Sequence, residues 1–231
     1  MTIQLHLLSD ATAVAEAVAS RLAGWLRERP ASVLALPSGN TPIEAYARLA
    51  DEPGLFGAAT VFALDEFVGL GADDPRSFAA FFQTHLFGPC GLPPTRAHVL
   101  NGLAADLEAE ARAYEAAIEA AGGLDLTLLG LGANGHIAFN EPAPTLGGRT
   151  HVVDLAPPSS AIAPRGITMG VGTLLAAPTV WLIATGDAKA EAVRRMTCGQ
   201  VDPACPASLL QLHPDAHVFL DTAAASAIEG I

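Results

Sequence analysis

Apolar runs of strand length alternate along this chain with longer stretches whose apolar residues recur at helical spacing. This pattern predicts buried strands at 32–36, 60–64, 125–131, 180–184 and 216–220. Shorter strands are predicted at 3–8, 98–100 and 151–155. Helices are predicted at 10–29, 43–50, 77–82, 104–121 and 189–198, with helical turns from 173 and at 207–212. Residues 1–231 are therefore expected to form one α/β domain, a doubly wound, mostly parallel sheet with helices on both faces.

The strand predicted at 125–131 leads into a glycine-rich turn and then into side chains that can move protons. Gly132 tolerates the backbone of a tight turn, and His136, Asn140 and Glu141 follow it closely. Parallel α/β sheets hold their sites at the carboxyl ends of strands. A lone histidine here would more simply be a hydrogen-bonded loop residue. Three polar residues converging after one strand favour a candidate site instead.

A loop of small polar residues follows the strand predicted at 32–36. It contains Ser38, Gly39, Asn40 and Thr41, and Pro42 then suits the first turn of the next helix. Free N–H groups and the helix dipole at such a position favour a bound phosphate. An ordinary strand-to-helix turn has the same pattern, so this loop alone does not decide between the two.

Charged residues follow two further strands. Asp65 and Glu66 come directly after the strand at 60–64, where partial burial makes it costly to ionise both. In the alternative interpretation, Asp65 caps the next loop and Glu66 is solvated. Lys189, the sole lysine of the chain, lies in the first turn of the helix after the strand at 180–184. This position favours a role in phosphate binding.

In a parallel sheet these four clusters share one edge. The loop at Ser38 and the turn at Lys189 suit an anion, whereas the carboxylates and the histidine suit proton transfer. The chain has no nucleotide motif, no phosphate-plus-magnesium motif and no paired metal-ligand spacing. We therefore predict an acid–base enzyme without cofactor or metal, acting on a phosphorylated small molecule.

Composition narrows the class of protein further. Twelve basic residues against 24 acidic ones give a net charge of −12, which argues against a nucleic-acid partner. The three cysteines are odd in number, and free cytosolic thiols are expected. The apolar runs are too short to span a bilayer, and no leader-like segment opens the chain. We expect a soluble, cytoplasmic protein with no membrane partner.

Residues 131–142, Leu-Gly-Ala-Asn-Gly-His-Ile-Ala-Phe-Asn-Glu-Pro, closely resemble the signature of glucosamine-6-phosphate deaminases. Residues 37–42 resemble the phosphate loop of the same superfamily, which also contains 6-phosphogluconolactonases, and 65–70 resemble the deaminases' second signature. With a further match at 165–175, the resemblance covers nearly the whole chain. It implies a hydrolase that converts glucosamine 6-phosphate and water to fructose 6-phosphate and ammonia.

The resemblance also implies roles for individual residues. His136 would transfer the proton that opens the pyranose ring, Glu141 would orient and tune it, and Asp65 would move a proton between C2 and C1. The implied phosphate site is formed by Ser38, Gly39, Asn40, Thr41, Arg165 and Lys189. Asn134 stands where some deaminases have Asp. An amide cannot ionise, but it can accept a hydrogen bond and orient the imidazole, so Asn134 is a supporting residue.

Two rival functions remain open at this point. A 6-phosphogluconolactonase would need the histidine but would have no use for Glu141 or for a C2 proton shuttle. A non-catalytic sugar-phosphate sensor would keep the phosphate loop and lose an acid–base residue. The connection at 156–164 is shorter than in allosteric deaminases, and the chain ends soon after its last strand. We therefore expect a monomer with hyperbolic kinetics, in which Arg149 pins its loop or belongs to a vestigial effector site.

Overall fold

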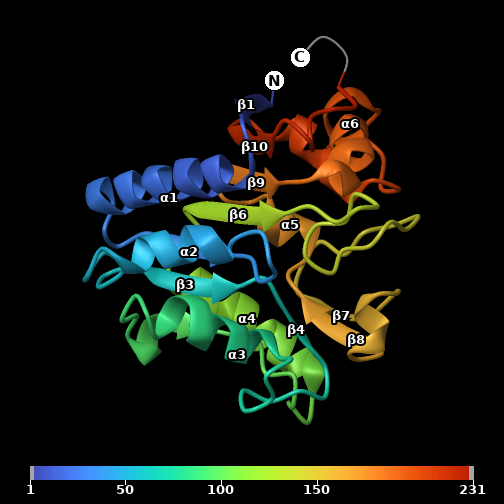
Figure 1. Cartoon of the computed structure of the whole chain (residues 1–231). Coiled ribbons are helices and arrows are strands. Elements are labelled where there is room, and N and C mark those ends of the chain that lie inside the picture. Colours follow the sequence, from blue (N-terminus) through green and yellow to red (C-terminus); the bar gives the residue numbers. More distant parts are fainter. Residues whose placement is uncertain (1–2, 229–231) are drawn as a thin grey trace.

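Seven strands pair in one parallel sheet at the centre of the structure, a computed structural model that describes residues 3–228 (Figure 1). The strands are β1 (Gln4–Leu8), β2 (Val33–Leu36), β3 (Thr60–Ala63), β5 (Ala97–His98), β6 (Leu126–Gly130), β9 (Thr179–Ala184) and β10 (Ala216–Asp221). Their order across the sheet is β1-β10-β9-β6-β2-β3-β5, and every pairing is parallel. The prediction of a mostly parallel sheet is confirmed.

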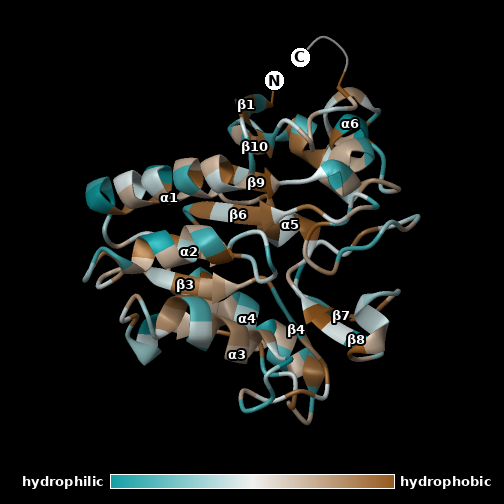
Figure 2. Cartoon of the chain, viewed as in Figure 1, coloured by the Kyte–Doolittle hydropathy of each residue, from teal (hydrophilic) through white to brown (hydrophobic). Residues whose placement is uncertain are grey.

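Helices cover both faces of this sheet. One face carries α1 (Ala11–Glu28), α2 (Ile43–Ala50) and α3 (Phe78–Phe82), and the other carries α4 (Leu107–Ala120), α5 (Val171–Leu174) and α6 (Ala190–Cys198). Side chains alternate between the two layers, so Leu34 and Leu36 pack with α1 and α2 while Val33 and Ala35 pack on the opposite face. Figure 2 shows the result as brown strands beside an α1 that alternates brown and teal.

Capping residues set where several helices begin. The Asp10 carboxylate accepts a hydrogen bond from the Ala13 N–H, and Asp106 does the same for Ala109. The latter cap starts α4 at Leu107, later than the predicted 104. The shorter helical segments are a π-helix (Gln83–Phe87) and 3₁₀ turns at Pro94–Arg96, Ser159–Ala161, Asp187–Lys189 and Pro206–Leu212.

A second, antiparallel sheet of three strands stands beside the main one. It consists of β4 (Asp65–Phe67), β8 (Arg165–Thr168) and β7 (His151–Asp154), in that order. Only β7 was predicted, because β4 and β8 are short and pair with each other across about a hundred residues. Gly166 lets this sheet pack closely, since a Cβ there would lie 2.6 Å from the Phe139 ring.

The chain order creates a switch point in the main sheet. From β2 the chain moves outward to β3 and β5, and it then returns to β6 on the other side of β2. Ligands of open α/β sheets bind at the carboxyl ends of strands beside such a reversal. The four predicted clusters follow β3, β2, β6 and β9, which are neighbours in the sheet. In Figure 1 the arrowheads of β3 and β6 point toward the side where β7 and β8 lie.

Candidate active site

The loop after β6 folds into a tight turn that supports an imidazole. The Gly132 N–H donates to the His136 carbonyl at 2.9 Å, and the Gly135 N–H donates to the Gly132 carbonyl at 3.0 Å. Gly135 has a φ of +93°, which favours glycine. A Cβ at Gly132 would come within 2.5 Å of the His136 ring. The imidazole therefore packs directly against the main chain, and glycine at 132 makes the space for it.

His136, Glu141 and Asn134 form a connected polar group. His136 Nδ1 lies 3.1 Å from Glu141 Oε1, and Asn134 Nδ2 donates to Glu141 Oε2 at 2.6 Å. The contact with His136, followed by the hydrogen bond from Asn134, holds the pKa of Glu141 below its usual value although partial burial opposes this. An ionised Glu141 favours the tautomer with its proton on Nδ1, which leaves Nε2 free to act as a base.

Asn134 contacts the main chain of His136 and the carboxylate of Glu141 through its side-chain amide. Its Oδ1 accepts the main-chain N–H of His136 at 3.1 Å, and its Nδ2 bonds to Glu141. The amide therefore supports His136 through the turn and through Glu141. Arg195 adds a bond from its guanidinium to the Asn134 carbonyl at 3.3 Å and another to Ala204 at 2.6 Å. Arg195 was not predicted, and no sequence motif marks it.

Asp65 opens β4 and is 6% exposed. Burial, with the neighbouring Glu66, raises the pKa of Asp65 well above its usual range. Glu66 points the other way and is also buried. Its carboxylate accepts bonds from the N–H groups of Phe67, Phe78 and Ala79 at 2.7 to 2.9 Å and thereby caps the start of α3. The alternative in which Glu66 is solvated is therefore wrong.

The end of β8 joins the Asp65 strand to the His136 loop. Thr168 lies opposite Asp65 in the small sheet, and its Oγ1 accepts the Phe139 N–H at 3.2 Å. Asn140 is buried, and its Nδ2 donates to the Met169 carbonyl at 2.8 Å. Both candidate proton-transfer groups are thus supported by the same two residues of one strand end. Thr168 was not predicted, because its place depends on long-range strand pairing.

The candidate anion-binding segments lie on either side of the β6 loop. Ser38, Gly39, Asn40 and Thr41 connect β2 to α2, and Gly39 has a φ of +100°. Lys189 precedes α6 after β9, and burial lowers the pKa of its amine. Since β2 and β9 both pair with β6, the loop and the lysine flank the His136 turn at the same sheet edge.

An acidic residue that was not predicted, Asp221, shapes the approach to Lys189. Gly186 has a φ of +86°, and its N–H donates to both carboxylate oxygens of Asp221 at 3.0 Å. The same carboxylate accepts the Ala224 N–H at 2.7 Å. Asp221, at the end of β10, therefore fixes the turn from which the lysine emerges.

Arg165 lies at the start of the middle strand of the small sheet. It begins β8, its side chain is exposed, and its carbonyl accepts the Val68 N–H at 3.0 Å. Because β8 runs antiparallel to β4, Thr168 faces Asp65 while Arg165 lies three residues away, roughly 10 Å along the strand. Arg165 lines a groove with Leu103 and Asp106 instead.

Comparison with known proteins places the chain in a family. A family model described as glucosamine-6-phosphate isomerases/6-phosphogluconolactonase matches residues 9–219. The chain belongs to this family. It is 43% identical to a glucosamine-6-phosphate deaminase of Rhodopirellula baltica over 98% of this chain and 96% of the relative. A glucosamine-6-phosphate deaminase of Shewanella loihica is also 43% identical, over 97% of this chain and 89% of the relative.

Solved structures agree on the fold of this isomerase/lactonase family member. A monomeric glucosamine-6-phosphate deaminase superposes with a TM-score of 0.91 at 34% identity, covering 97% of this chain and all of the other. A 6-phosphogluconolactonase from Thermotoga maritima has a TM-score of 0.79 at 21% identity, covering 95% of this chain and 99% of the other, and shows the fold alone. No helix within residues 3–228 is long and apolar enough to cross a membrane.

Proposed function

We propose that this protein is a glucosamine-6-phosphate deaminase, which converts glucosamine 6-phosphate and water to fructose 6-phosphate and ammonia. The observation that carries the proposal is the His136–Glu141 pair at the same sheet edge as the buried Asp65. A lactonase needs one base for its water, whereas an aldose-to-ketose conversion needs a second group for the C2 proton. The deaminases similar to this chain over nearly its full length support the same choice.

In the proposed first step, His136 opens the pyranose ring. Its Nε2 takes the proton of the C1 hydroxyl and delivers it to the ring oxygen as the bond between C1 and that oxygen breaks. The product is the open-chain aldehyde. The ionised Glu141 stabilises the imidazolium that forms in between, and the contact of 3.1 Å with Nδ1 fits this role.

In the second step, Asp65 takes the proton from C2 and returns one to C1 by way of an enolamine. The resulting imine adds water at C2 and releases ammonia, so the net reaction is a hydrolysis built around an isomerisation. Asp65 acts as a base only when ionised, and its burial opposes ionisation. The protonated amine of the substrate supplies a neighbouring positive charge, which lowers the pKa of Asp65 on binding. None of these steps requires a cofactor.

We propose that Ser38, Gly39, Asn40, Thr41 and Lys189 hold the substrate phosphate. Main-chain N–H groups before α2 and a single ammonium before α6 suit an anion, and both segments flank the His136 turn. Arg165 is left out of this site, because it lies at the other end of β8.

The similar deaminase that is a monomer supports a monomeric state here. The unpaired thiols of Cys90, Cys198 and Cys205 favour a reducing compartment and so a cytoplasmic location. The net charge of −12 supports a small-molecule partner over a nucleic acid.

One panel of assays tests the proposal. Ammonia release is measured with glucosamine, galactosamine and N-acetylglucosamine 6-phosphates, and lactone hydrolysis is measured with 6-phosphogluconolactone. We expect ammonia and fructose 6-phosphate from glucosamine 6-phosphate, and no ammonia from the acetylated sugar, whose nitrogen is an amide. Lactone hydrolysis without ammonia release would overturn the proposal in favour of a lactonase. Phosphosugar binding without turnover of any substrate would favour a sensor.

A further inference from the structure

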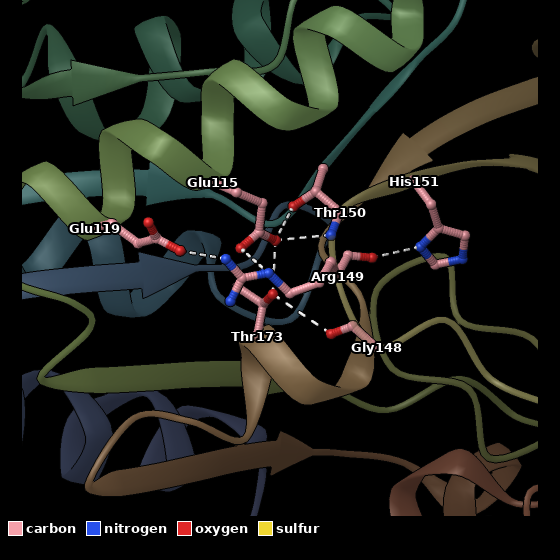
Figure 3. Close-up of polar contacts among 7 residues, drawn as sticks. All are labelled: Glu115, Glu119, Gly148, Arg149, Thr150, His151 and Thr173. Carbon is pink, nitrogen blue, oxygen red and sulfur yellow. Dashed lines mark hydrogen bonds and ion pairs between the residues drawn. The ribbon is translucent and has the colours of Figure 1, made fainter.

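A buried carboxylate outside the candidate site holds together two segments that leave it. Glu115 on α4 is 6% exposed, and its Oε1 accepts three hydrogen bonds (Figure 3). The donors are the Thr150 N–H at 2.7 Å, the Thr150 hydroxyl at 2.6 Å and the Thr173 hydroxyl at 2.6 Å. Oε2 lies 3.2 Å from Arg149 Nε, and Arg149 also pairs with the exposed Glu119. A buried charge is retained only when it is partnered in this way.

The two threonines belong to different segments. Thr150 ends the segment that runs from Glu141 to β7, and Thr173 lies on α5, which follows the end of β8. The main chains of these segments also touch, since the Val171 N–H donates to Gly147 and the Thr173 N–H to Gly148, both at 2.9 Å. Glycine allows this approach, because a Cβ at Gly172 would lie 2.6 Å from the Gly148 carbonyl oxygen.

The end of β8 connects this cluster to the proton-transfer groups. Thr168, which lies opposite Asp65, and Met169, which follows it, hold the loop of His136 through Phe139 and Asn140. A shift of α5 against the 147–150 segment would therefore move the support that Asp65 and His136 share. The phosphate-binding segments follow β2 and β9 of the main sheet, outside the contacts of Glu115.

We propose that Glu115 is a positioning residue for the reaction: through Thr150 and Thr173 it fixes the end of β8 and thereby the placement of Asp65 relative to His136. This inference rests on the proposed deaminase function. Displacements of about 1 Å cost up to ~10²-fold in rate when catalytic groups lose their alignment. The effect of weakening the cluster should therefore fall on kcat, whereas KM for the phosphosugar should change little.

The test compares Thr173→Val with Thr173→Ser in the full-length protein. Valine keeps the shape of the side chain and removes one donor to Glu115, whereas serine keeps the hydroxyl. We expect kcat for ammonia release to fall about tenfold in Thr173→Val with KM within about twofold of wild type, and serine to restore kcat. Glu119→Gln is the matched control, because it removes only the negative charge of the exposed partner of Arg149, and its kcat should equal that of wild type.

Glu115→Gln provides a second measurement. The amide oxygen can replace Oε1, but the amide N–H groups would face Arg149 Nε, so a larger loss of kcat is expected. If this variant does not fold, the Thr173 pair decides. A Thr173→Val protein with a lower Tm and unchanged kcat would overturn the inference and leave Glu115 with a purely structural role. A wild-type protein that releases no ammonia would overturn the proposed function, and this inference with it.

Discussion

The Gly132→Ala substitution tests the placement of His136 separately from folding, because it adds a single carbon atom beside the imidazole. The new Cβ would come within 2.5 Å of the His136 ring, whereas carbon atoms pack at roughly 3.5 Å or more. The imidazole must therefore move by about 1 Å. Its side chain is 29% exposed, so the ring can swing toward solvent without opening the core.

The expected magnitude follows from this displacement. A shift of about 1 Å in a catalytic group costs up to ~10²-fold in rate, so kcat for deamination should fall by roughly that factor. Stability should change little, because Gly→Ala gains ~0.4–1 kcal/mol through the unfolded chain and local strain offsets that gain. A net change of about 1 kcal/mol would move Tm by only ~2–4 °C in a chain of this size.

Gly130→Ala is the matched control for this experiment. Gly130 ends the same strand, and a Cβ there would meet no atom within 4 Å. Steady-state ammonia release and thermal unfolding are measured for both variants and for wild type. We expect a loss of turnover in Gly132→Ala alone. If Gly132→Ala turned over substrate as fast as Gly130→Ala and wild type, the assignment of His136 to the chemistry would be refuted.

Two further predictions concern the anion site and the far end of the sheet. Lys189→Met should raise KM for the phosphosugar much more than it lowers kcat, because the phosphate is held equally well in the ground state and the transition state. A large fall in kcat at constant KM would instead show that Lys189 takes part in the chemistry. His6→Phe keeps the ring that stacks on Phe219 and removes a titrating group. Burial, followed by Arg21 and His217, lowers the pKa of His6, so its neutral form stabilises the fold fully above about pH 6.5 and this contribution is lost as pH falls below that value. The Tm should therefore fall less steeply between pH 8 and pH 5 in His6→Phe than in wild type. Parallel curves of Tm against pH would contradict the prediction.

The main sheet could be predicted because its signals are local. Each central strand is an apolar run bounded by turn residues, and the helix at 43–50 has the predicted limits. The position of the clusters at one edge followed from parallel pairing alone. These features depend on neighbouring residues and on a general rule of α/β sheets.

The small sheet and its consequences could not be predicted in the same way. The strands at 65–67 and 165–168 are short and pair across about a hundred residues, so no local pattern marks them. Their antiparallel pairing places Thr168 opposite Asp65 and Arg165 at the other end of the same strand. The burial of Glu66 under the start of α3 likewise depends on tertiary contacts.

The most direct test of the central claim is the turnover of Asp65→Asn. The amide has the shape of the carboxyl and, like its protonated form in this buried place, carries no charge, so the fold should be retained. We predict that kcat for ammonia release from glucosamine 6-phosphate falls by ~10²–10⁴-fold, the usual contribution of a positioned base. Binding of the phosphosugar, measured by calorimetry, should persist because the phosphate-binding segments are unchanged. Near-normal turnover in this variant would contradict the assignment of Asp65 as the group that moves the C2 proton.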